Sequence, residues 1–241
     1  MTILVVTGTG TEIGKTITTA AVAACASGRI AIVKLAQTGV APGAPGDLAE
    51  VSRLSGRADG YEFARYPDPL SPHHAAFISG LPPLDQGAAV MRLAELDDDY
   101  DLVIVEGAGG LLVPYAERER WTVLDLADEL DVSYLVVASA GLGTINHTTL
   151  TMNSLEEASV EIEGIVVGSW PAEPGLAERC NVFDLAQLAR GGELLGVLPA
   201  GMATMADFPG QAHAALAPRL GGTFDFRAFR AAIRPQPRGA A

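Results

Sequence analysis

The stretch Gly8-Thr9-Gly10-Thr11-Glu12-Ile13-Gly14-Lys15-Thr16 decides the fold that this sequence predicts. The apolar, β-branched run over residues 3–6 precedes it and is typical of a buried strand. The alanine-rich run over residues 17–27 follows it, is typical of a helix and stops at Gly28. A strand, a glycine-rich loop and a helix in this order indicate a loop that holds the phosphates of a nucleotide.

Each residue type in this loop has a physical task. Glycines let the backbone curl so that successive N–H groups face a polyphosphate, and the helix that starts near Gly14 adds its positive dipole end. Lys15 is expected to bridge the β- and γ-phosphates, and the Thr16 hydroxyl to bind Mg²⁺. The strict pattern G-x-x-x-x-G-K-[ST] requires glycine at position 9, where this chain has Thr9, so the loop is a longer variant that begins at Gly8. The alternative is a strand-to-helix turn that contains Gly-Lys-Thr by chance, and the flanking elements argue against it.

Composition limits the classes of protein to consider. With 241 residues, of which 49% are hydrophobic, the chain can bury one sizeable core, and we expect a single domain. Its net charge of −13 repels nucleic acid and anionic membranes, so neither is expected as a partner. Cys25 and Cys180 lack C-x-x-C spacing, which indicates neither a disulfide framework nor a zinc site. Because the sequence has no signal-peptide pattern and no apolar run of about 18 residues, we expect a cytoplasmic protein.

Apolar strands alternate with helical segments along the rest of the chain. We expect strands over residues 30–34, 102–106, 134–138, 164–167 and 194–198. We expect helices over residues 47–54, from 72 onward, 84–96, 123–130, 144–158, 176–189 and 211–220. This alternation predicts a single-domain α/β fold of the P-loop NTPase type, with a mainly parallel sheet covered by helices on both faces. The domain is expected to span residues 1–233, and the Pro- and Gly-rich tail over residues 234–241 to be disordered.

Polar residues interrupt the apolar runs at the ends of the predicted strands. Since ligands of such folds bind outside the carboxyl ends of the strands, Lys34, Thr38, Glu106 and the segment from Gly141 onward should gather beside the phosphate loop. Lys34 is either a second phosphate ligand or a lysine that extends to water, in a polar site near solvent where its loss barely changes stability. Glu106 stands where nucleotide-hydrolysing folds keep an acidic Mg²⁺ partner, although it could simply pair with a nearby lysine. Asp47 is explained by helix capping, and could also contact Mg²⁺ or nucleotide.

Six blocks of the sequence then stand out together. They are the glycine-rich loop over residues 8–16, Lys34-Leu-Ala-Gln-Thr38-Gly39, Asp47, Leu70-Ser71-Pro72-His73, Val105-Glu106-Gly-Ala-Gly-Gly110 and Leu142-Gly-Thr-Ile-Asn146-His147. In this order, from the start of the chain to about residue 200, they resemble the dethiobiotin synthetase family. The longer glycine loop is that family's own form of the motif.

The resemblance implies a reaction and a set of ligands. The family closes a cyclic urea on 7,8-diaminononanoate with CO₂, at the expense of ATP and with Mg²⁺, in biotin synthesis. A carbamate forms on one amine of the substrate, takes the γ-phosphoryl group as a mixed anhydride, and is attacked by the other amine. The family is a homodimer whose substrate lies across the interface.

The motif match assigns roles to individual residues. The implied catalytic residues are Lys34, Lys15, Thr11 and Glu12. The implied Mg²⁺ ligands are Thr16, Asp47 and Glu106. The implied substrate-binding residues are Thr38 and, from the partner's helix start, Gly143, Thr144 and Asn146. The implied nucleotide-binding residues are Glu12, Ile13, Gly14, Lys15, Thr16, Ile17, Asp47, Glu106, Gly107, Ala108, Gly109, Gly168, Ser169, Val197, Leu198 and Pro199.

Two departures from the family pattern bear on these roles. Leu35 stands where the family often has proline after the active lysine. Gly168 and Ser169 correspond to the Asn-Asp pair that commonly reads adenine in the family. Because glycine offers no side chain to read the base, we expect ATP or another nucleoside triphosphate to serve as co-substrate, with little preference. Trp170 could stack on the base and add affinity without much selectivity.

A P-loop switch ATPase of the partitioning type is the alternative function, and a non-catalytic nucleotide-binding module is a weaker one. Partitioning ATPases usually carry a lysine early in the glycine loop, where this chain has Thr9 and Gly10. They often end in a basic amphipathic helix, where this chain has the short segment over residues 234–238. A module without catalysis would leave Lys34, Thr38 and Glu106 without a task.

Overall fold

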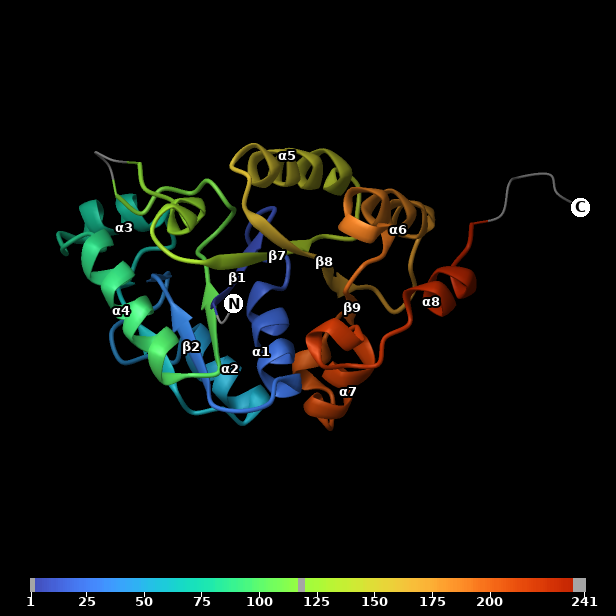
Figure 1. The fold of residues 1–241 in the computed structure, drawn as a ribbon, viewed down its shortest axis with the longest axis horizontal. Helices are drawn as coiled ribbons and strands as arrows, with labels where there is room; N and C mark the ends of the chain where they lie inside the picture. The colour runs from blue at the N-terminus through green and yellow to red at the C-terminus, as the bar shows by residue number, and fades with distance from the viewer. Residues whose placement is uncertain (1–2, 117–119, 236–241) are drawn as a thin grey trace, which may run out of the picture.

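A seven-stranded parallel sheet forms the centre of the protein (Figure 1). The computed structural model describes residues 3–116 and 120–235. The strands are β1 Ile3–Gly8, β2 Ile30–Lys34, β3 Gln37–Thr38, β4 Gly60–Glu62, β5 Arg65–Tyr66, β6 Leu102–Glu106, β7 Val132–Ala138, β8 Glu161–Trp170 and β9 Gly196–Pro199. Their order in the large sheet is β4-β2-β6-β1-β7-β8-β9, with every neighbouring pair parallel. Strands β3 and β5 form a separate parallel pair.

Helices cover both faces of this sheet. They are α1 Lys15–Cys25, α2 Asp47–Ser55, α3 Pro72–Ser79, α4 Gln86–Asp99, α5 Thr144–Glu157, α6 Leu176–Leu188, α7 Phe208–Ala215 and α8 Phe226–Ala232. Helices α1, α2 and α7 bury their apolar sides against one face, in a core that includes Leu4, Val6 and Ile32. Helices α4, α5 and α6 pack on the other face, in a core that includes Val5 and Val33. Successive strand residues therefore point to opposite cores, which confirms the predicted α/β class.

The structure differs from the predicted elements at several places. The segment expected to be a helix over residues 123–130 is a 3₁₀ helix over Leu124–Asp128. The helix expected over residues 211–220 begins earlier, at Phe208, because the Asp207 carboxylate caps it by accepting from the Gly210 N–H. Helix α8 was not predicted.

Three further findings concern the end of strand β8, the tail of the chain and helices that could span a membrane. Strand β8 continues past the predicted residues 164–167 to Trp170. Most of the tail expected to be disordered, residues 236–241, lies outside the described residues. Within the described residues, no helix is long and apolar enough to cross a membrane.

Candidate active site

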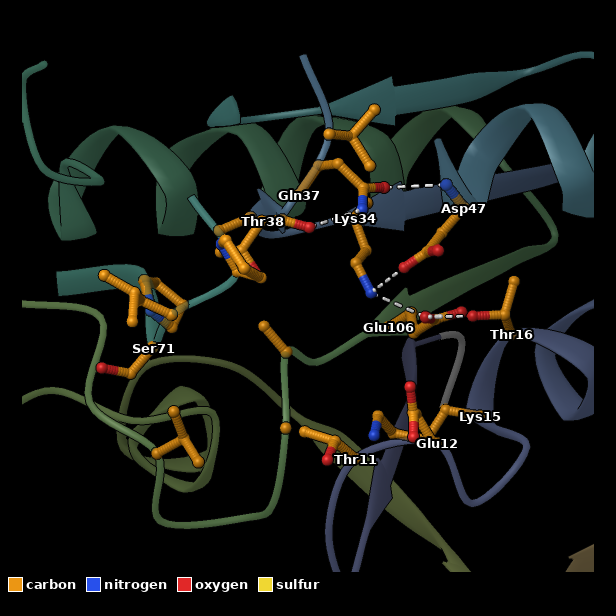
Figure 2. Close-up of a pocket in the computed structure, with 18 of the residues that line it drawn as sticks. Thr11, Glu12, Lys15, Thr16, Lys34, Gln37, Thr38, Asp47, Ser71 and Glu106 are labelled. Atoms are coloured by element: carbon orange, nitrogen blue, oxygen red, sulfur yellow. Dashed lines mark hydrogen bonds and ion pairs between the residues drawn. The ribbon is translucent and has the colours of Figure 1, made fainter. Parts of the chain in front are cut away.

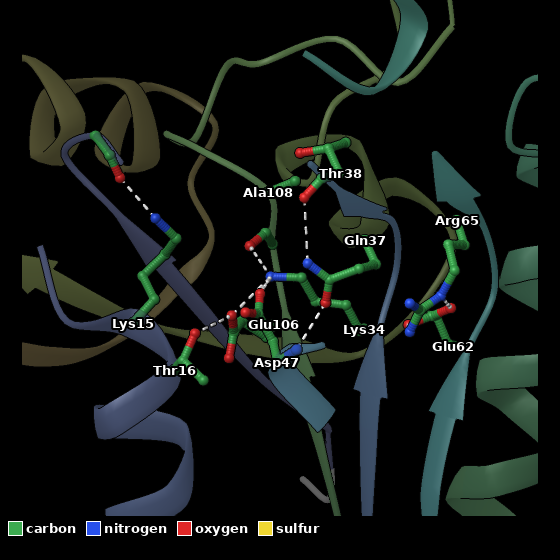
Figure 3. Close-up of polar contacts among 12 residues, drawn as sticks. Lys15, Thr16, Lys34, Gln37, Thr38, Asp47, Glu62, Arg65, Glu106 and Ala108 are labelled. Carbon is green, nitrogen blue, oxygen red and sulfur yellow. Dashed lines mark hydrogen bonds and ion pairs between the residues drawn. The ribbon is translucent and has the colours of Figure 1, made fainter. Parts of the chain in front are cut away.

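The glycine-rich loop connects β1 to α1 and directs the first turn of α1 toward the site. Gly14 precedes α1 with φ 97°, a left-handed conformation that favours glycine. A Cβ atom there would lie 2.3 Å from the carbonyl oxygen of Gly168, so the two backbones meet at this point. Lys15 folds back over its own loop, and its Nζ donates to the carbonyl oxygen of Gly10 at 2.6 Å (Figure 3). Burial lowers the pKa of Lys15 to about 8, and the nearby carboxylate of Glu106 opposes this shift only in part.

The order of the strands brings four polar side chains together at one edge of the sheet. Strand β6 lies between β2 and β1, and Glu106 at its end is in register with Lys34 on one side and Val6 on the other. Lys34 Nζ donates to Glu106 Oε1 at 2.7 Å and lies 2.6 Å from Asp47 Oδ2 (Figures 2 and 3). The Thr16 hydroxyl donates to the same Glu106 oxygen at 2.9 Å. The prediction that Lys34, Thr38 and Glu106 gather beside the phosphate loop is therefore confirmed.

Lys34 is a buried cation, and the expectation of a site near solvent is wrong. The residue is 4% exposed, and Glu106 is 2% exposed. Burial works against the charged form of Lys34, but the combined attraction and hydrogen bonds of Glu106 and Asp47 outweigh it and raise the pKa of Lys34 above its usual value. Lys34 therefore stays protonated between two carboxylates.

Asp47 is not the capping residue of its helix. The capping position of α2 is Gly46, and Asp47 is the first helical residue. Its carboxylate lies on Lys34, while its backbone N–H donates to Gln37 Oε1 at 2.7 Å. Asp47 therefore contributes its carboxylate to the site, and Gln37 accepts the hydrogen bond of its backbone N–H.

These side chains line a pocket with a volume of about 970 Å³ (Figure 2). The lining residues are Thr11, Glu12, Gly14, Lys15, Thr16, Ile17, Lys34, Ala36, Gln37, Thr38, Val40, Asp47, Pro69, Leu70, Ser71, Pro72, Glu106, Ala108, Gly109 and Val113. The predicted catalytic and Mg²⁺-binding residues, together with Thr38, are all among them. Ile13 and Gly107 belong to the same segments and lie between lining residues.

One wall of the pocket contains no residue for which a role was predicted. It consists of residues 69–72, which lead into α3. The Ser71 hydroxyl lies 3.2 Å from His73 Nδ1, which in turn lies 3.2 Å from the carbonyl oxygen of Pro114. The Leu-Ser-Pro-His block was the available signal, but the pattern alone does not show that this wall faces the glycine-rich loop.

The residues expected to lie beside the nucleotide base are outside this pocket. Gly168 packs directly on the glycine-rich loop, and a Cβ atom there would lie 2.2 Å from the Ile13 carbonyl oxygen. Trp170 makes an edge-to-face contact with Phe229 of α8, with ring centroids 5.4 Å apart. Val197, Leu198 and Pro199 belong to β9, which pairs with β8 beside this point.

The residues expected to bind substrate from a partner also lie outside the pocket. Gly143 precedes α5 with φ 91°, and Thr144 is buried. Asn146 is exposed on the first turn of α5. Leu142 and Leu150, close by in sequence, are 88% and 59% exposed. Within one chain, Gly143, Thr144 and Asn146 are therefore not among the residues that line the pocket.

The fold and the site define a class of protein. A parallel sheet with a glycine-rich loop between its central strand and a helix, and with lysine and acidic side chains at the same sheet edge, is a P-loop nucleotide-binding protein. A family model described as "AAA domain" matches residues 2–206.

Curated relatives narrow this class to one family. A protein of Saccharopolyspora erythraea named ATP-dependent dethiobiotin synthetase BioD is 53% identical over 92% of this chain and 98% of its own length. Proteins of the same name from Rhodococcus jostii and Streptomyces avermitilis are 55% and 50% identical, over 86% and 98% of this chain and 90% and 100% of their own lengths. The chain belongs to the ATP-dependent dethiobiotin synthetase family, which confirms the resemblance found in the sequence. Among solved structures, it is similar to the MinC:MinD cell division protein complex of Aquifex aeolicus, with a TM-score of 0.49 and 14% identity over 88% of this chain and 86% of that chain.

Proposed function

We propose that this protein closes the ring of dethiobiotin from 7,8-diaminononanoate and CO₂, driven by ATP. The observation that carries the proposal is the buried Lys34, held 2.6 Å from Asp47 and 2.7 Å from Glu106 beside the glycine-rich loop. Curated relatives that match this chain over nearly its whole length carry the synthetase name, which favours this function over a partitioning ATPase. We assign the reaction to the cytoplasm, where ATP is available.

The oxygen atoms in this site fit a magnesium ion. The Thr16 hydroxyl and the carboxylates of Asp47 and Glu106 are hard oxygen ligands, the kind that Mg²⁺ prefers. Both carboxylates already face one positive charge, the Lys34 ammonium. When bound, Mg²⁺ would neutralise charge on the β- and γ-phosphates. Thr16, Asp47 and Glu106 would hold it.

The chain's own groups position the reactants and stabilise charge. One amine of the substrate adds to CO₂ and loses a proton, which forms a carbamate. A carbamate oxygen then attacks the γ-phosphorus and ADP leaves. Lys15 and Lys34 stabilise the charge of the transferring phosphoryl group. The second amine attacks the carbamoyl carbon and loses a proton, phosphate leaves, and the cyclic urea is complete. Thr38 hydrogen-bonds the carbamate, with Thr11 and Glu12 lining the same pocket.

We further propose that the substrate lies between two copies of the chain. Gly143, Thr144 and Asn146 begin a helix of 14 residues whose N–H groups suit a carboxylate, and the substrate carries one. Exposed Leu142 and Leu150 provide apolar surface on either side. In a homodimer, this helix start would reach the pocket of the partner.

The nucleotide base is proposed to bind near Gly168, Ser169 and residues 197–199. Gly168 packs on the glycine-rich loop, and as a glycine it has no side chain that could hydrogen-bond the base. ATP is therefore accepted, and other nucleoside triphosphates should be accepted too.

A product assay tests the proposed function. The protein is incubated with diaminononanoate, bicarbonate, Mg²⁺ and ATP, and dethiobiotin is measured by mass spectrometry. Formation of dethiobiotin that requires all four components supports the proposal. Rapid ATP hydrolysis without diamine, and no dethiobiotin when diamine is added, would support the switch ATPase instead.

A further inference from the structure

Gln37 makes two contacts that the proposed mechanism does not use. It lies three residues after Lys34, is 4% exposed, and lines the pocket. Its Oε1 accepts from the backbone N–H of Asp47 at 2.7 Å, and its Nε2 donates to the carbonyl oxygen of Thr38 at 3.3 Å (Figures 2 and 3). One amide group thus connects Thr38 to the beginning of α2.

The start of α2 needs an acceptor from outside the helix. The first N–H groups of a helix have no partner within it, and a capping side chain usually accepts one of them. Here the capping residue is Gly46, which has no side chain, and the Asp47 carboxylate lies on Lys34. Gln37 supplies an acceptor in their place. The Asp47 side chain is consequently turned toward Lys34.

Glycine at position 46 makes room for this contact. A Cβ atom there would lie 2.6 Å from Gln37 Oε1 and 2.9 Å from Gln37 Cδ. Its next neighbour would be Arg65 Nη2 at 3.1 Å, the end of a flexible side chain. The φ of Gly46 is −112°, which any residue can adopt. The absence of a side chain at this position is therefore explained by Gln37.

We propose that Gln37 is a positioning residue. It holds Asp47, and with it the proposed Mg²⁺ site, at a fixed position relative to Thr38, which is proposed to bind the substrate. The role in Mg²⁺ binding rests on the proposed function, whereas the hold on the Asp47 amide does not. Gln37 acts through the backbone at both ends of the loop over residues 39–46, by its contacts with the Thr38 carbonyl oxygen and the Asp47 N–H.

The first test measures the contact in nucleotide-free protein. Gln37→Met keeps the length of the side chain and removes both hydrogen bonds. Amide hydrogen exchange at Asp47, followed by NMR, should become about tenfold faster, the effect of one lost hydrogen bond. Amides within α1, such as that of Ala21, should exchange at the wild-type rate. Unchanged exchange at Asp47 would overturn the proposal.

The second test measures Mg²⁺ dependence. In the dethiobiotin assay, Gln37→Met should raise the Mg²⁺ concentration for half-maximal rate about tenfold, with a smaller change in the KM for diaminononanoate. An unchanged Mg²⁺ dependence together with faster Asp47 exchange would reduce Gln37 to a structural residue and overturn its positioning role. If no dethiobiotin forms even with wild-type protein, the proposed function fails, and the exchange result still decides whether Gln37 holds Asp47.

A matched variant keeps Gln37 and displaces it. Gly46→Ala places a methyl group on Gln37 Oε1 and should reproduce the exchange and Mg²⁺ effects of Gln37→Met. In a Gln37→Ala background the methyl group has room, so Gly46→Ala should add no further effect. Additive effects of the two substitutions would show that Gly46 acts by another route and would contradict the proposal.

Discussion

Lys34→Ala should weaken the fold as well as the reaction. The substitution leaves two carboxylates without their cation. Asp47 can turn to water, since its side chain is 34% exposed. Glu106 is 2% exposed and, among the residues that the structure describes, keeps only its hydrogen bond from Thr16. Removing one partner of a buried ion pair costs about 3–5 kcal/mol, and one stranded carboxylate with one remaining hydrogen bond places this case near about 3 kcal/mol. The same substitution should lower kcat at least about a hundredfold.

Urea denaturation at neutral pH measures the free energy of unfolding. The double variant Lys34→Ala with Glu106→Gln carries no stranded charge, so it should recover about 2 kcal/mol of the loss while staying inactive. Equal slopes of unfolding free energy against urea would show that the denatured states are comparable. A loss below about 1 kcal/mol for Lys34→Ala would refute the argument, because it would mean that Glu106 is not stranded.

The other predictions concern protons, nucleotides and assembly. The pKa of Lys15 in the folded protein is about 8, below its ordinary value of 10.5. The free energy of unfolding of the nucleotide-free protein should therefore increase as pH rises from about 8 to 10.5. Phosphate binding needs the Lys15 ammonium, so it should weaken over the same pH range. Calorimetry in buffers of different ionisation enthalpy should therefore show proton uptake on nucleotide binding above pH 8, and Lys15→Arg should abolish it. The kcat/KM values for ATP, CTP, GTP and UTP should agree within about tenfold, and an ATP preference of about a thousandfold would contradict this. Gly168→Ala, whose Cβ would lie 2.2 Å from the Ile13 carbonyl oxygen, should impair all four nucleotides alike, as steady-state rates would show. Mixing inactive Lys15→Ala and Asn146→Ala subunits should restore about a quarter of wild-type activity if each site uses both chains, and no recovery would exclude the shared site.

The elements around the phosphate loop could be predicted because their signals are local. Strands β2 and β6 begin and end where predicted, since each is an apolar, β-branched run that stops at a charged residue. Helix α8 was missed because its arginine-rich sequence lacks a strong apolar period, and its start depends on the Asp225 carboxylate as a cap. The 3₁₀ helix over Leu124–Asp128 has the same apolar spacing as a short α-helix, so the two could not be told apart.

The site could be predicted as a set of residues but not as a geometry. Strand ends in a parallel sheet indicate which polar residues share an edge, and this rule brought Lys34 and Glu106 together. The burial of Lys34 depends on β6 lying between β2 and β1 and on α2 returning Asp47 to it, and both are long-range features. The role of Gln37 was missed for the same reason, because its partner is ten residues away across a loop.

The strand order also has a consequence for the synthesis of the chain. Strand β1 is made first, yet its two neighbours are β6 and β7, which begin at Leu102 and Val132. At ordinary rates of translation, β1 waits on the order of ten seconds for its first partner. During that time an apolar strand with open edges, of the kind that aggregates, is exposed at the ribosome. We therefore expect the nascent chain to be prone to aggregation until β6 has joined the sheet, and nucleotide could stabilise it only after that point.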